Sequence, residues 1–497
     1  MKHFIYILLI STMLVACGHP SVPTDAKRSS SMPSIYPDYT EVTVPANICP
    51  LNFMVKDADE VVARLSCGTT SFTFGDGNKV MMDAGEWAEL RDAARGKSIS
   101  VEVFARKNDA WTEYKPFNIY VASDDIDRYV SFRLIQPSYV SFEGLSISQR
   151  DLTSFDMTDI YSNKLLQTEE EGQCINCHSY KNYKTDNMLF HMRIKDGGTM
   201  IVSDGKMEKI DLKTDSTISA GVYPAWNPAS DVIAFSTNNT CQVFLLKDRS
   251  KIEVMDTQSD LVLYDVKTKE VSTICNDSDE LEVFPTWSPD GKTLYYCDAH
   301  FALNGSGKNR EEEMIMRYKE VQYSIYSRSY DPQTHSFGAP QLVYDAASQG
   351  KSATLPRISP DGKYLVFALG NYGCFHVWHS EADIYMLNLA DNSVQPLTAL
   401  NSALSESYPS FSSNGRWIMT ASRRDDGNYT RPYISYLDKS GKCHKAFELP
   451  QEDPEFYGLF LRSFNRPEFM VEPVRITPRE FAEKAKLEPV KAKYISR

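Results

Sequence analysis

Residues 284–296 read Phe-Pro-Thr-Trp-Ser-Pro-Asp-Gly-Lys-Thr-Leu-Tyr-Tyr. The Pro-Asp-Gly step predicts a tight turn, because glycine accepts the positive φ that such a turn needs. The aromatic residue before the turn and the apolar run after it therefore belong to two adjacent strands. A third apolar run, residues 324–326, extends this small sheet.

The same phrase occurs at three other places in the chain, each time with a turn, an apolar run after it and a third run further on. Units of this kind, recurring about every 50 to 70 residues, predict radial or linear stacking of one structural unit. The other copies begin at residues 223, 355 and 408, and their third strands are residues 261–264, 383–386 and 433–436.

These copies resemble the TolB-like (WD40-like) propeller repeats, whose hallmark is Pro-x-aromatic-Ser-Pro-Asp-Gly. The resemblance covers about half of the chain and implies a TolB-like β-propeller over residues 187–465, while it says little about function. A degenerate copy at residues 188–212 precedes the four, and pairing of the two ends of the propeller would close a sixth blade. We therefore expect five or six blades, with an unclosed stack of sheets as the alternative.

The region before the repeats predicts a smaller β-domain. Residues 117–121 and 129–135 alternate apolar and polar side chains, as half-buried strands do, and a short helix is expected near residues 85–94. We assign an immunoglobulin-like β-sandwich to residues 38–150 and a polar connector to residues 151–186. The chain is thus expected to be all-β, with a sandwich followed by a propeller.

The N-terminus predicts an exported lipoprotein. Residues 4–14 are an apolar run too short to cross a bilayer, and Leu-Val-Ala precedes Cys17, as a lipoprotein signal peptidase requires. Residues 1–16 are then a signal peptide, Cys17 carries the lipid, and residues 17–37 form a flexible Pro- and Ser-rich tether. The alternative is an ordinary signal peptide with an incidental cysteine. We expect an anchor in the outer or inner membrane and a protein that faces the periplasm.

Composition narrows the possible partners and disulfides. The chain has 497 residues, a net charge of −13 and no clustered basic stripe, so we expect no nucleic acid partner. Export places its ten cysteines in an oxidising compartment, where disulfides persist. Assigning Cys17 to lipid and two cysteines to the motif below leaves an odd number, with Cys49 and Cys67 as the most natural pair. The others are Cys241, Cys275, Cys297, Cys374 and Cys443.

Residues 174–178, Cys-Ile-Asn-Cys-His, form the motif that carries chemistry. Two thiols at this spacing add across the two vinyl groups of haem, and the imidazole that follows becomes the proximal iron ligand. The sequence therefore predicts one covalent haem c, with thioethers at Cys174 and Cys177 and His178 on the iron. A thioredoxin-like redox pair, a zinc site and a plain disulfide are the alternatives. The first needs a βαβ context and the second needs further ligands.

The motif and the segment Met188-Leu189-Phe190-His191-Met192-Arg193 resemble a group of lipoproteins from Bacteroidetes-type bacteria. These proteins fuse a c-type haem motif to a TolB-like propeller. The resemblance covers most of the chain and implies no settled activity. The chain departs from small cytochromes c, because a short segment rather than a helical domain surrounds its motif.

The sixth iron ligand has two candidates in this segment. His191 follows the motif closely, and Met188 is the alternative distal ligand. If residues 188–193 form a strand, the two side chains point to opposite faces, so both cannot reach one iron. A histidine in a strand also has the simpler interpretation of packing or hydrogen bonding.

Three other segments have sequence patterns that predict a local structure or site. Residues 374–379, Cys-Phe-His-Val-Trp-His, could bind a metal, but they lack a fourth ligand, and aromatic packing in a propeller loop is the simpler interpretation. Residues 304–313 predict a surface insertion. In the tail, residues 466–497, Thr477 and Glu480 predict the capping box of a short helix.

The leading functional hypothesis is a haem-bearing envelope protein that acts in electron transfer or redox response, with the propeller as a docking face for an envelope redox protein. A second hypothesis is a non-catalytic scaffold module in which the haem is structural. A third is a peroxidase-like enzyme that uses an open sixth position. No hydrolase elbow, zinc-protease motif or phosphate loop occurs in the sequence.

Overall fold

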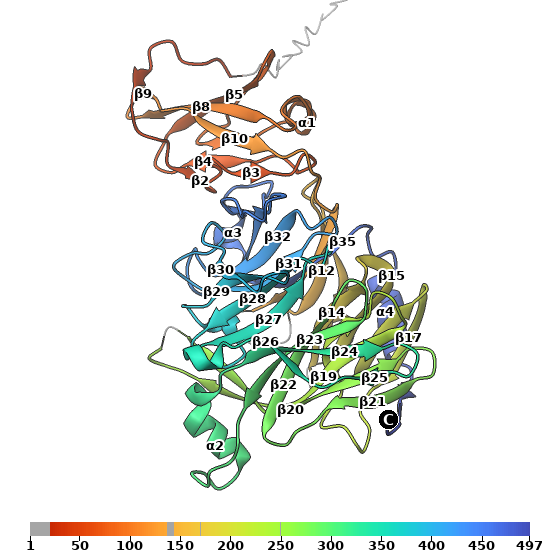
Figure 1. The fold of residues 1–497 in the computed structure, drawn as a ribbon. Helices are drawn as coiled ribbons and strands as arrows, with labels where there is room; N and C mark the ends of the chain where they lie inside the picture. Colours follow the sequence, from red (N-terminus) through yellow and green to blue (C-terminus); the bar gives the residue numbers. More distant parts are fainter. Residues whose placement is uncertain (1–19, 137–143, 169, 249) are drawn as a thin grey trace, which may run out of the picture.

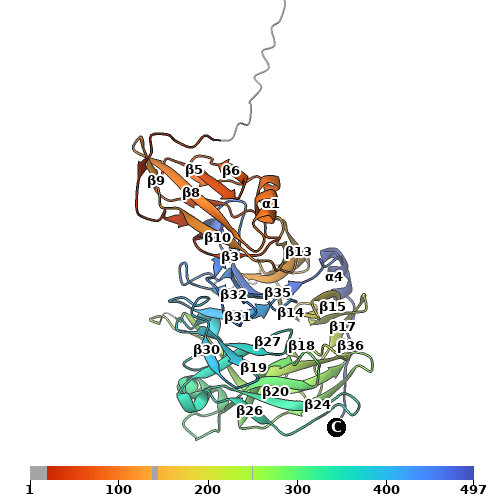
Figure 2. The same cartoon turned by 45° about the horizontal axis from the view of Figure 1, so that its top comes forward.

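The repeated phrase builds the inner part of a ring of β-sheets (Figure 1). The computed structural model describes residues 20–136, 144–168, 170–248 and 250–497. Cys17 and the predicted signal peptide, residues 1–16, lie outside these residues, so the lipoprotein assignment stays a prediction. Six blades form the ring, and a sandwich of residues near the N-terminus packs on one side of it (Figures 1 and 2).

Blades 2 to 6 follow one another along the chain, and each is an antiparallel sheet. The first strand of each blade lies innermost and contacts the first strands of the neighbouring blades. Blade 2 comprises β14 (Gln173–Lys181), β15 (Lys184–Ile194), β16 (Gly198–Ser203) and β17 (Lys206–Asp211), and blade 3 comprises β18 (Val222–Trp226), β19 (Val232–Phe244), β20 (Ile252–Asp265) and β21 (Glu270–Cys275). Blade 4 comprises β22 (Glu280–Trp287), β23 (Thr293–His300), β24 (Ser324–Asp331), β25 (Ser336–Phe337) and β26 (Gln341–Tyr344). Blade 5 comprises β27 (Ser352–Ile358), β28 (Tyr364–Gly370), β29 (Asp383–Asn388) and β30 (Val394–Pro396), and blade 6 comprises β31 (Glu406–Phe411), β32 (Trp417–Ser422), β33 (Arg431–Tyr436) and β34 (Phe447–Glu448).

The predicted turns are present between the first and second strands of the blades. Gly291, Gly362 and Gly415 have φ of +68°, +72° and +67°, values that disfavour residues with a Cβ atom. The Gly291 amide donates to the carbonyl of Ser288 at 2.9 Å, which closes the turn. The turn chemistry visible in the sequence therefore sets the spacing of the first two strands.

Blade 1 closes the ring with strands from both sides of the propeller sequence. Its order is β13 (Met157–Ser162), β12 (Ser146–Asp151), β11 (Tyr129–Ile135) and β35 (Ser463–Met470), and β35 is the inner strand. Strand β35 pairs antiparallel with β11 and contacts both β31 and β14, the inner strands on either side. The fold is therefore all-β, with six blades, within the predicted five or six.

The domain boundaries predicted from the sequence need correction. The sequence predicts that β11 belongs to a sandwich of residues 38–150 and β13 to a connector of residues 151–186. The structure places both strands in blade 1, and β14 becomes the inner strand of blade 2. Alternation of apolar and polar residues is the same in a sandwich and in a blade. What distinguishes a blade from a sandwich here is the pairing of β11 with β35, which lies more than 300 residues further along the chain. The Ser131 hydroxyl, for example, donates to the carbonyl of Glu468, 337 residues away.

The N-terminal domain is a β-sandwich with a helix. Its core includes Phe53 from one sheet, Leu65 from the other and Trp87 from the helix. Parallel pairs β1–β9 and β3–β10 depart from the antiparallel pattern of immunoglobulin sheets. The seven-stranded sheet contains β1 (Lys27–Arg28), β3 (Thr43–Val44), β5 (Glu60–Cys67), β6 (Thr70–Phe74), β8 (Ser98–Lys107), β9 (Ala110–Glu113) and β10 (Phe117–Val121); the other sheet contains β2 (Ile35–Tyr36), β4 (Phe53–Val55) and β7 (Lys79–Val80); the helix is α1 (Ala84–Ala93).

The sandwich and the propeller share one hydrophobic core, which includes Trp417 of blade 6 and Phe464 of blade 1. Polar contacts fix their relative position. Trp417 Nε1 donates to the carbonyl of Asp125 at 3.0 Å, and the Tyr436 hydroxyl donates to Asp124 at 2.7 Å. The sandwich is thus held on blades 6 and 1, away from the opposite side of the ring where blades 3 and 4 lie (Figure 1).

The C-terminal tail runs along the outer edges of two blades. Helix α4 (Pro478–Ala485) has the predicted capping box of Thr477 and Glu480, and Phe481 is fully buried against the core of blade 2. The short strands β36 (Val490–Lys491) and β37 (Lys493–Tyr494) then pair with β17 and β21. The tail therefore covers edges that the blades would otherwise expose.

The predicted disulfide between Cys49 and Cys67 is wrong. Both thiols are free, and so are the other cysteines among the described residues. Cys49 is fully buried near the Arg150 guanidinium, while Cys67 lies at the end of β5 with its thiol 3.6 Å from the Ala93 carbonyl. Proximity in the sequence could not reveal that the two side chains have different surroundings.

The segment between β23 and β24 is the predicted insertion. It contains α2 (Arg310–Arg317), capped by Asn309, and the Glu313 carboxylate accepts the backbone amides of Asn304 and Gly305. No helix in the described part of the chain is long and apolar enough to span a membrane.

Candidate functional site

The six inner strands share a two-residue bulge near the middle of the strand. A register shift in each blade leaves two consecutive residues unpaired, and the first of them has φ between 48° and 58°. In five blades the second is proline, which lacks the N–H that would otherwise need a partner. We call the first residues the waist ring, because they line the central channel: Arg466, Cys177, Tyr223, Phe284, Leu355 and Tyr408.

Blade 2 differs from the other blades at this bulge. Cys177 occupies the waist-ring position and has φ of 58°, and His178 stands where the other blades have proline. The Cys-x-x-Cys-His motif is therefore part of an inner propeller strand. It does not lie in a connector between two domains, as the sequence had suggested, because β14 pairs with β15 on one side of the bulge and again on the other.

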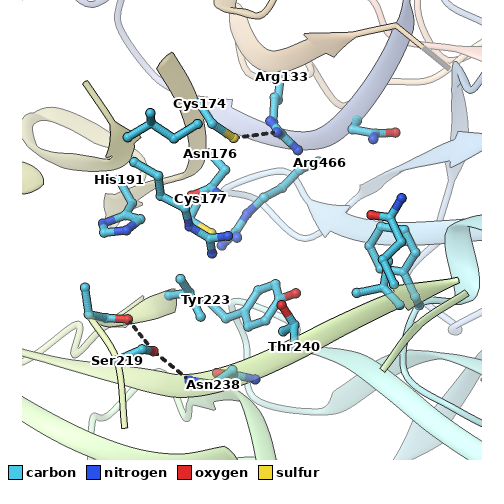
Figure 3. A pocket seen from close by; sticks show the side chains of 18 of the residues that line it. Arg133, Cys174, Asn176, Cys177, His191, Ser219, Tyr223, Asn238, Thr240 and Arg466 are labelled. Atoms are coloured by element: carbon cyan, nitrogen blue, oxygen red, sulfur yellow. Dashed lines mark hydrogen bonds between the residues drawn. The ribbon is translucent and has the colours of Figure 1, made fainter. Parts of the chain in front are cut away.

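Both motif thiols line one cavity at a mouth of the channel, on the side where the inner strands begin (Figure 3). The volume of the cavity is about 570 Å³, within the range of about 300 to 1,000 Å³ that is typical of cofactor pockets. Figure 3 shows Cys174, Cys177 and His191 on one wall, with Tyr223 and Thr240 facing them from blade 3.

Strand register explains which side chains reach this cavity. Cys174 is paired with Arg193, and Asn176 with His191, so these four side chains share one face of the sheet. Met188 points to the opposite face, where it is fully buried in the core beside α4. The predicted alternative ligand therefore does not face the cavity, and the sequence argument that His191 and Met188 point to opposite faces matches the structure.

His191 is held in place by one hydrogen bond. Its Nδ1 atom lies 3.0 Å from the Thr199 hydroxyl on the neighbouring strand β16. Burial, with the positive charge of Arg193, lowers the pKa of the imidazole to about 3, so the ring is neutral at physiological pH. A metal-ligating histidine is usually neutral, with one ring nitrogen on the metal and the other hydrogen-bonded to a neighbouring group.

His178 is fully buried but does not line the cavity. Neither ring nitrogen makes a hydrogen bond of normal geometry within the described part of the chain. Burial, with the positive charges of Arg466 and Arg133 nearby, lowers the pKa of this imidazole well below its usual value, and a contact with the Ser131 backbone offsets only part of this effect. His178 is therefore a neutral imidazole with unsatisfied nitrogens, which is an unusual state for a buried polar side chain.

These residues fit a c-type haem by their donor set. Two thiols at the required spacing face one cavity of cofactor size. One neutral imidazole is adjacent to Cys177 in the chain, and a second, His191, lines the same cavity as the thiols. His178 has a contact with the Ser131 backbone and does not line the cavity, so its assignment as an iron ligand rests on the motif. Of the predicted site residues, the structure thus brings together Cys174, Cys177 and His191 and leaves His178 behind the wall of the cavity.

The cavity also contains three arginines that the sequence analysis did not identify: Arg133, Arg193 and Arg466. For two of these arginines the sequence contains a pattern that predicts their position at the cavity. Arg193 lies two residues after His191, which places both on the same face of a strand. Arg466 precedes Pro467 and so matches the residue-proline step of the repeats. Arg133 comes from blade 1, and its position depends on the long-range pairing of β11.

The second predicted cluster, residues 374–379, has a packing role. His379 and Glu253 form a fully buried pair with Nε2 and Oε2 2.7 Å apart, and His376 Nδ1 lies 2.9 Å from the Thr354 hydroxyl. No group of three or more His, Cys, Asp or Glu residues in the described ranges is arranged to hold a metal ion. These contacts fasten the short 3₁₀ helix His376–Trp378 to β20 and β27.

The ring of six blades and the cavity at its mouth define the class of protein: a six-bladed β-propeller with two cysteines facing a central cavity. No protein family profile and no curated protein matches the sequence.

Several solved structures of propeller-containing proteins are similar. TolB from Acinetobacter baumannii is 14% identical, with a TM-score of 0.42 over 78% of this chain and 85% of TolB. Tricorn protease is 12% identical, with a TM-score of 0.36 over 72% of this chain and 34% of its own. Oligogalacturonate lyase from Vibrio parahaemolyticus is 13% identical, with a TM-score of 0.32 over 63% of this chain and 92% of its own. At these identities the likeness concerns the fold alone.

Proposed function

We propose that this chain is an envelope lipoprotein that carries one covalent haem c at the mouth of its propeller channel and acts in one-electron transfer or redox response. The observation that supports this most is that Cys174 and Cys177 face the same cavity of about 570 Å³, together with His191. A shared cavity is what simultaneous attachment of one macrocycle to two thiols requires.

The proposal gives each residue a defined task. The thiols of Cys174 and Cys177 each add across one vinyl group, so that an S–C bond forms and the thiol proton moves to the neighbouring vinyl carbon. His178 and His191 are neutral imidazoles, the state in which histidine binds a metal. The haem supplies a one-electron redox couple, while the blades restrict the access of water to it.

Rigidity of the site favours electron transfer over ligand turnover. Cys174 in β14 and His191 in β15 each pair with a residue of the neighbouring strand, and Cys177 lies in the bulge of β14. Thr199 orients the His191 ring. A metal centre with fixed ligands changes its redox state with little rearrangement. Lipid at Cys17 would hold this carrier at the membrane, and fatty-acid labelling of the wild type compared with Cys17→Ala tests that part.

Covalent attachment is the decisive test. The protein is expressed together with a haem-attachment machinery and examined by pyridine haemochrome spectroscopy and intact mass. We expect one haem on the wild type and none on the Cys174→Ser/Cys177→Ser variant. Cys374→Ser removes a buried thiol that does not line the cavity and serves as the matched control, with haem retained. A wild-type protein without a c-type spectrum and without the haem mass would refute the proposal.

A further inference from the structure

The cavity has a charge opposite to that of the whole protein. The chain carries a net charge of −13. The residues that line the cavity nevertheless include three arginines, Arg133, Arg193 and Arg466, and no aspartate or glutamate. Figure 3 shows Arg133 and Arg466 beside the two cysteines. A local concentration of guanidinium groups in an acidic protein indicates a site for an anion.

Arg466 is the one cavity arginine with an acidic partner. It is buried, and its Nε atom lies 3.3 Å from a Glu468 carboxylate oxygen. That carboxylate also pairs with Arg357, so one negative charge serves two guanidinium groups. The charge of this group is therefore only partly neutralised.

Arg133 and Arg193 have no ion pair with any described residue. Arg133 donates from Nε to the Ile175 carbonyl at 2.8 Å, and another of its nitrogens lies 3.7 Å from the Cys174 sulfur. The Arg193 side chain makes no hydrogen bond within the described ranges and is exposed on the cavity side of β15. Asp256 is a buried carboxyl that forms no ion pair with a described residue; burial raises its pKa to about 6, and the positive charge of Arg193 offsets only part of this effect.

Guanidinium groups in this state favour carboxylate ligands. Arginine keeps its charge at any physiological pH, and its planar group of donors matches the two oxygens of a carboxylate. Arg133 is partly buried, and a partly buried guanidinium without a counter-charge costs free energy that an incoming anion restores. Arg193 is exposed at the cavity, where its charge can meet an anion without first leaving another partner. The rest of the lining is uncharged, with Tyr223, Val222 and Phe375 among its apolar and aromatic groups. The ligand that suits such a lining is a flat apolar body that carries carboxylates.

We propose that the cavity recognises a tetrapyrrole by its carboxylates, through Arg193 and Arg133, before and independently of any covalent bond. This inference rests on the proposed function, because it names the group of the cofactor that the chain binds. It adds that recognition is ionic and precedes thioether formation. On this view the arginines select the dianionic form of the macrocycle, and the thiols then fix it in place.

Iron(III) mesoporphyrin IX tests the inference, because its ethyl groups cannot form thioethers. The haem-free protein is titrated with the diacid and with its dimethyl ester, and binding is followed by absorbance. We expect the diacid to bind at least tenfold more tightly than the ester. Arg193→Gln should weaken diacid binding about tenfold, which corresponds to about 1.4 kcal/mol, and leave ester binding unchanged.

Lys195→Gln is the matched control. It removes one positive charge two residues further on, at a side chain that pairs with Glu171 and does not line the cavity, so both affinities should stay at the wild-type level. Arg193 is preferred to Arg133 for the test, because the bond from Arg133 to Ile175 also supports β14.

Two outcomes of the titrations would overturn the inference: equal affinity for diacid and ester, or an Arg193→Gln effect that is the same for both. A protein that binds succinate but not the porphyrin diacid would also overturn it, because the cavity would then be a site for small anions. Failure of the proposed function is a separate result. A protein that never acquires covalent haem but distinguishes diacid from ester would refute the proposed function and support carboxylate recognition.

Discussion

His178 and His191 differ in what surrounds each ring. The His191 ring is oriented by Thr199 and lines the cavity, whereas His178 is enclosed between blades 1 and 2 without a hydrogen bond of normal geometry among the described residues. Under the proposed function, the motif assigns His178 as the proximal ligand. The strand register, rather than the motif, brings His191 to the same cavity. Of the two imidazoles, only His191 lines the cavity in this structure.

The first prediction concerns the sixth ligand of the haem-loaded protein. We expect a six-coordinate, low-spin spectrum for the wild type. His191→Ala should shift the spectrum towards high spin and admit carbon monoxide or cyanide more readily, because one strong ligand is lost. Thr199→Val should have a smaller effect in the same direction, since it removes only the orienting hydrogen bond.

Met188→Leu is the control for this prediction. Its side chain is fully buried on the opposite face of β15, and the substitution keeps volume and polarity, so the spectrum should not change. An unchanged low-spin spectrum in His191→Ala, or a high-spin shift in Met188→Leu, would show that the ligand assignment is wrong.

The pairing of adjacent strands within a blade determines which charged side chains lie next to each other. In blade 4, Glu282 of β22 and Asp298 of β23 are direct cross-strand partners, so two carboxyl groups face each other on the same side of the sheet. Glu282 is 3% exposed. Burial, together with the charge of Asp260, raises the pKa of Glu282 to about 7, and burial with the charge of Glu282 raises the pKa of Asp298 as well. The pair is therefore most stable when it is protonated.

The second prediction is a pH dependence of stability that this pair causes. Because the pKa of Glu282 is higher in the folded than in the unfolded chain, its stabilising contribution is complete below about pH 4 and is lost as the pH rises through about 7. Glu282→Gln should reduce this loss and make the protein more stable than the wild type at pH 8, by about 1 to 3 kcal/mol.

Urea unfolding at several pH values measures the difference. Glu89→Gln, at an exposed position of α1, is the control and should leave the pH profile unchanged. If Glu282→Gln follows the wild-type profile, the raised pKa of Glu282 is not the cause of the pH dependence.

The ring as a whole depends on one strand from the end of the propeller sequence. Strand β35 supplies the inner edge of blade 1 and contacts the inner strands of blades 2 and 6. It also contributes Arg466 to the waist ring and Phe464 to the core shared with the sandwich. Closure of the ring, attachment of the sandwich and the shape of the cavity therefore depend on the same eight residues, Ser463–Met470.

The third prediction tests this closure. Phe464 is 1% exposed and packs edge-on against Phe132 of β11, with ring centroids 5.1 Å apart. Phe464→Ala should lower the free energy of unfolding by about 3 to 5 kcal/mol, because it leaves a cavity where the ring closes. Leu461→Ala, at a side chain that is 66% exposed, should change it by less than about 0.5 kcal/mol.

Chemical denaturation followed by tryptophan fluorescence reports both values. Equal midpoints for Phe464→Ala and Leu461→Ala would contradict the role of β35 in closing the ring. Faster proteolysis of Phe464→Ala than of the wild type would support it, since β11 loses packing against its inner neighbour.

The sequence by itself determined the parts of this protein that rest on local chemistry. Glycine at a positive φ, proline at an unpaired bulge position and alternation with a period of two act within a few residues, so the blades, their turns and the capping box of α4 were predictable. The spacing of Cys174, Cys177 and His178 is equally local, and it pointed to the site before the fold was known.

Only the tertiary structure decided which distant segments meet. The pairing of β11 with β35 moved the domain boundaries, and it brought Arg133 and Arg466 to the two thiols. Packing also gave Cys49 and Cys67 separate surroundings and placed His178 behind the cavity wall. The pairing of β11 with β35 joins residues more than 300 positions apart, for which a local pattern carries no signal, because a strand has the same alternation whichever neighbour it finds.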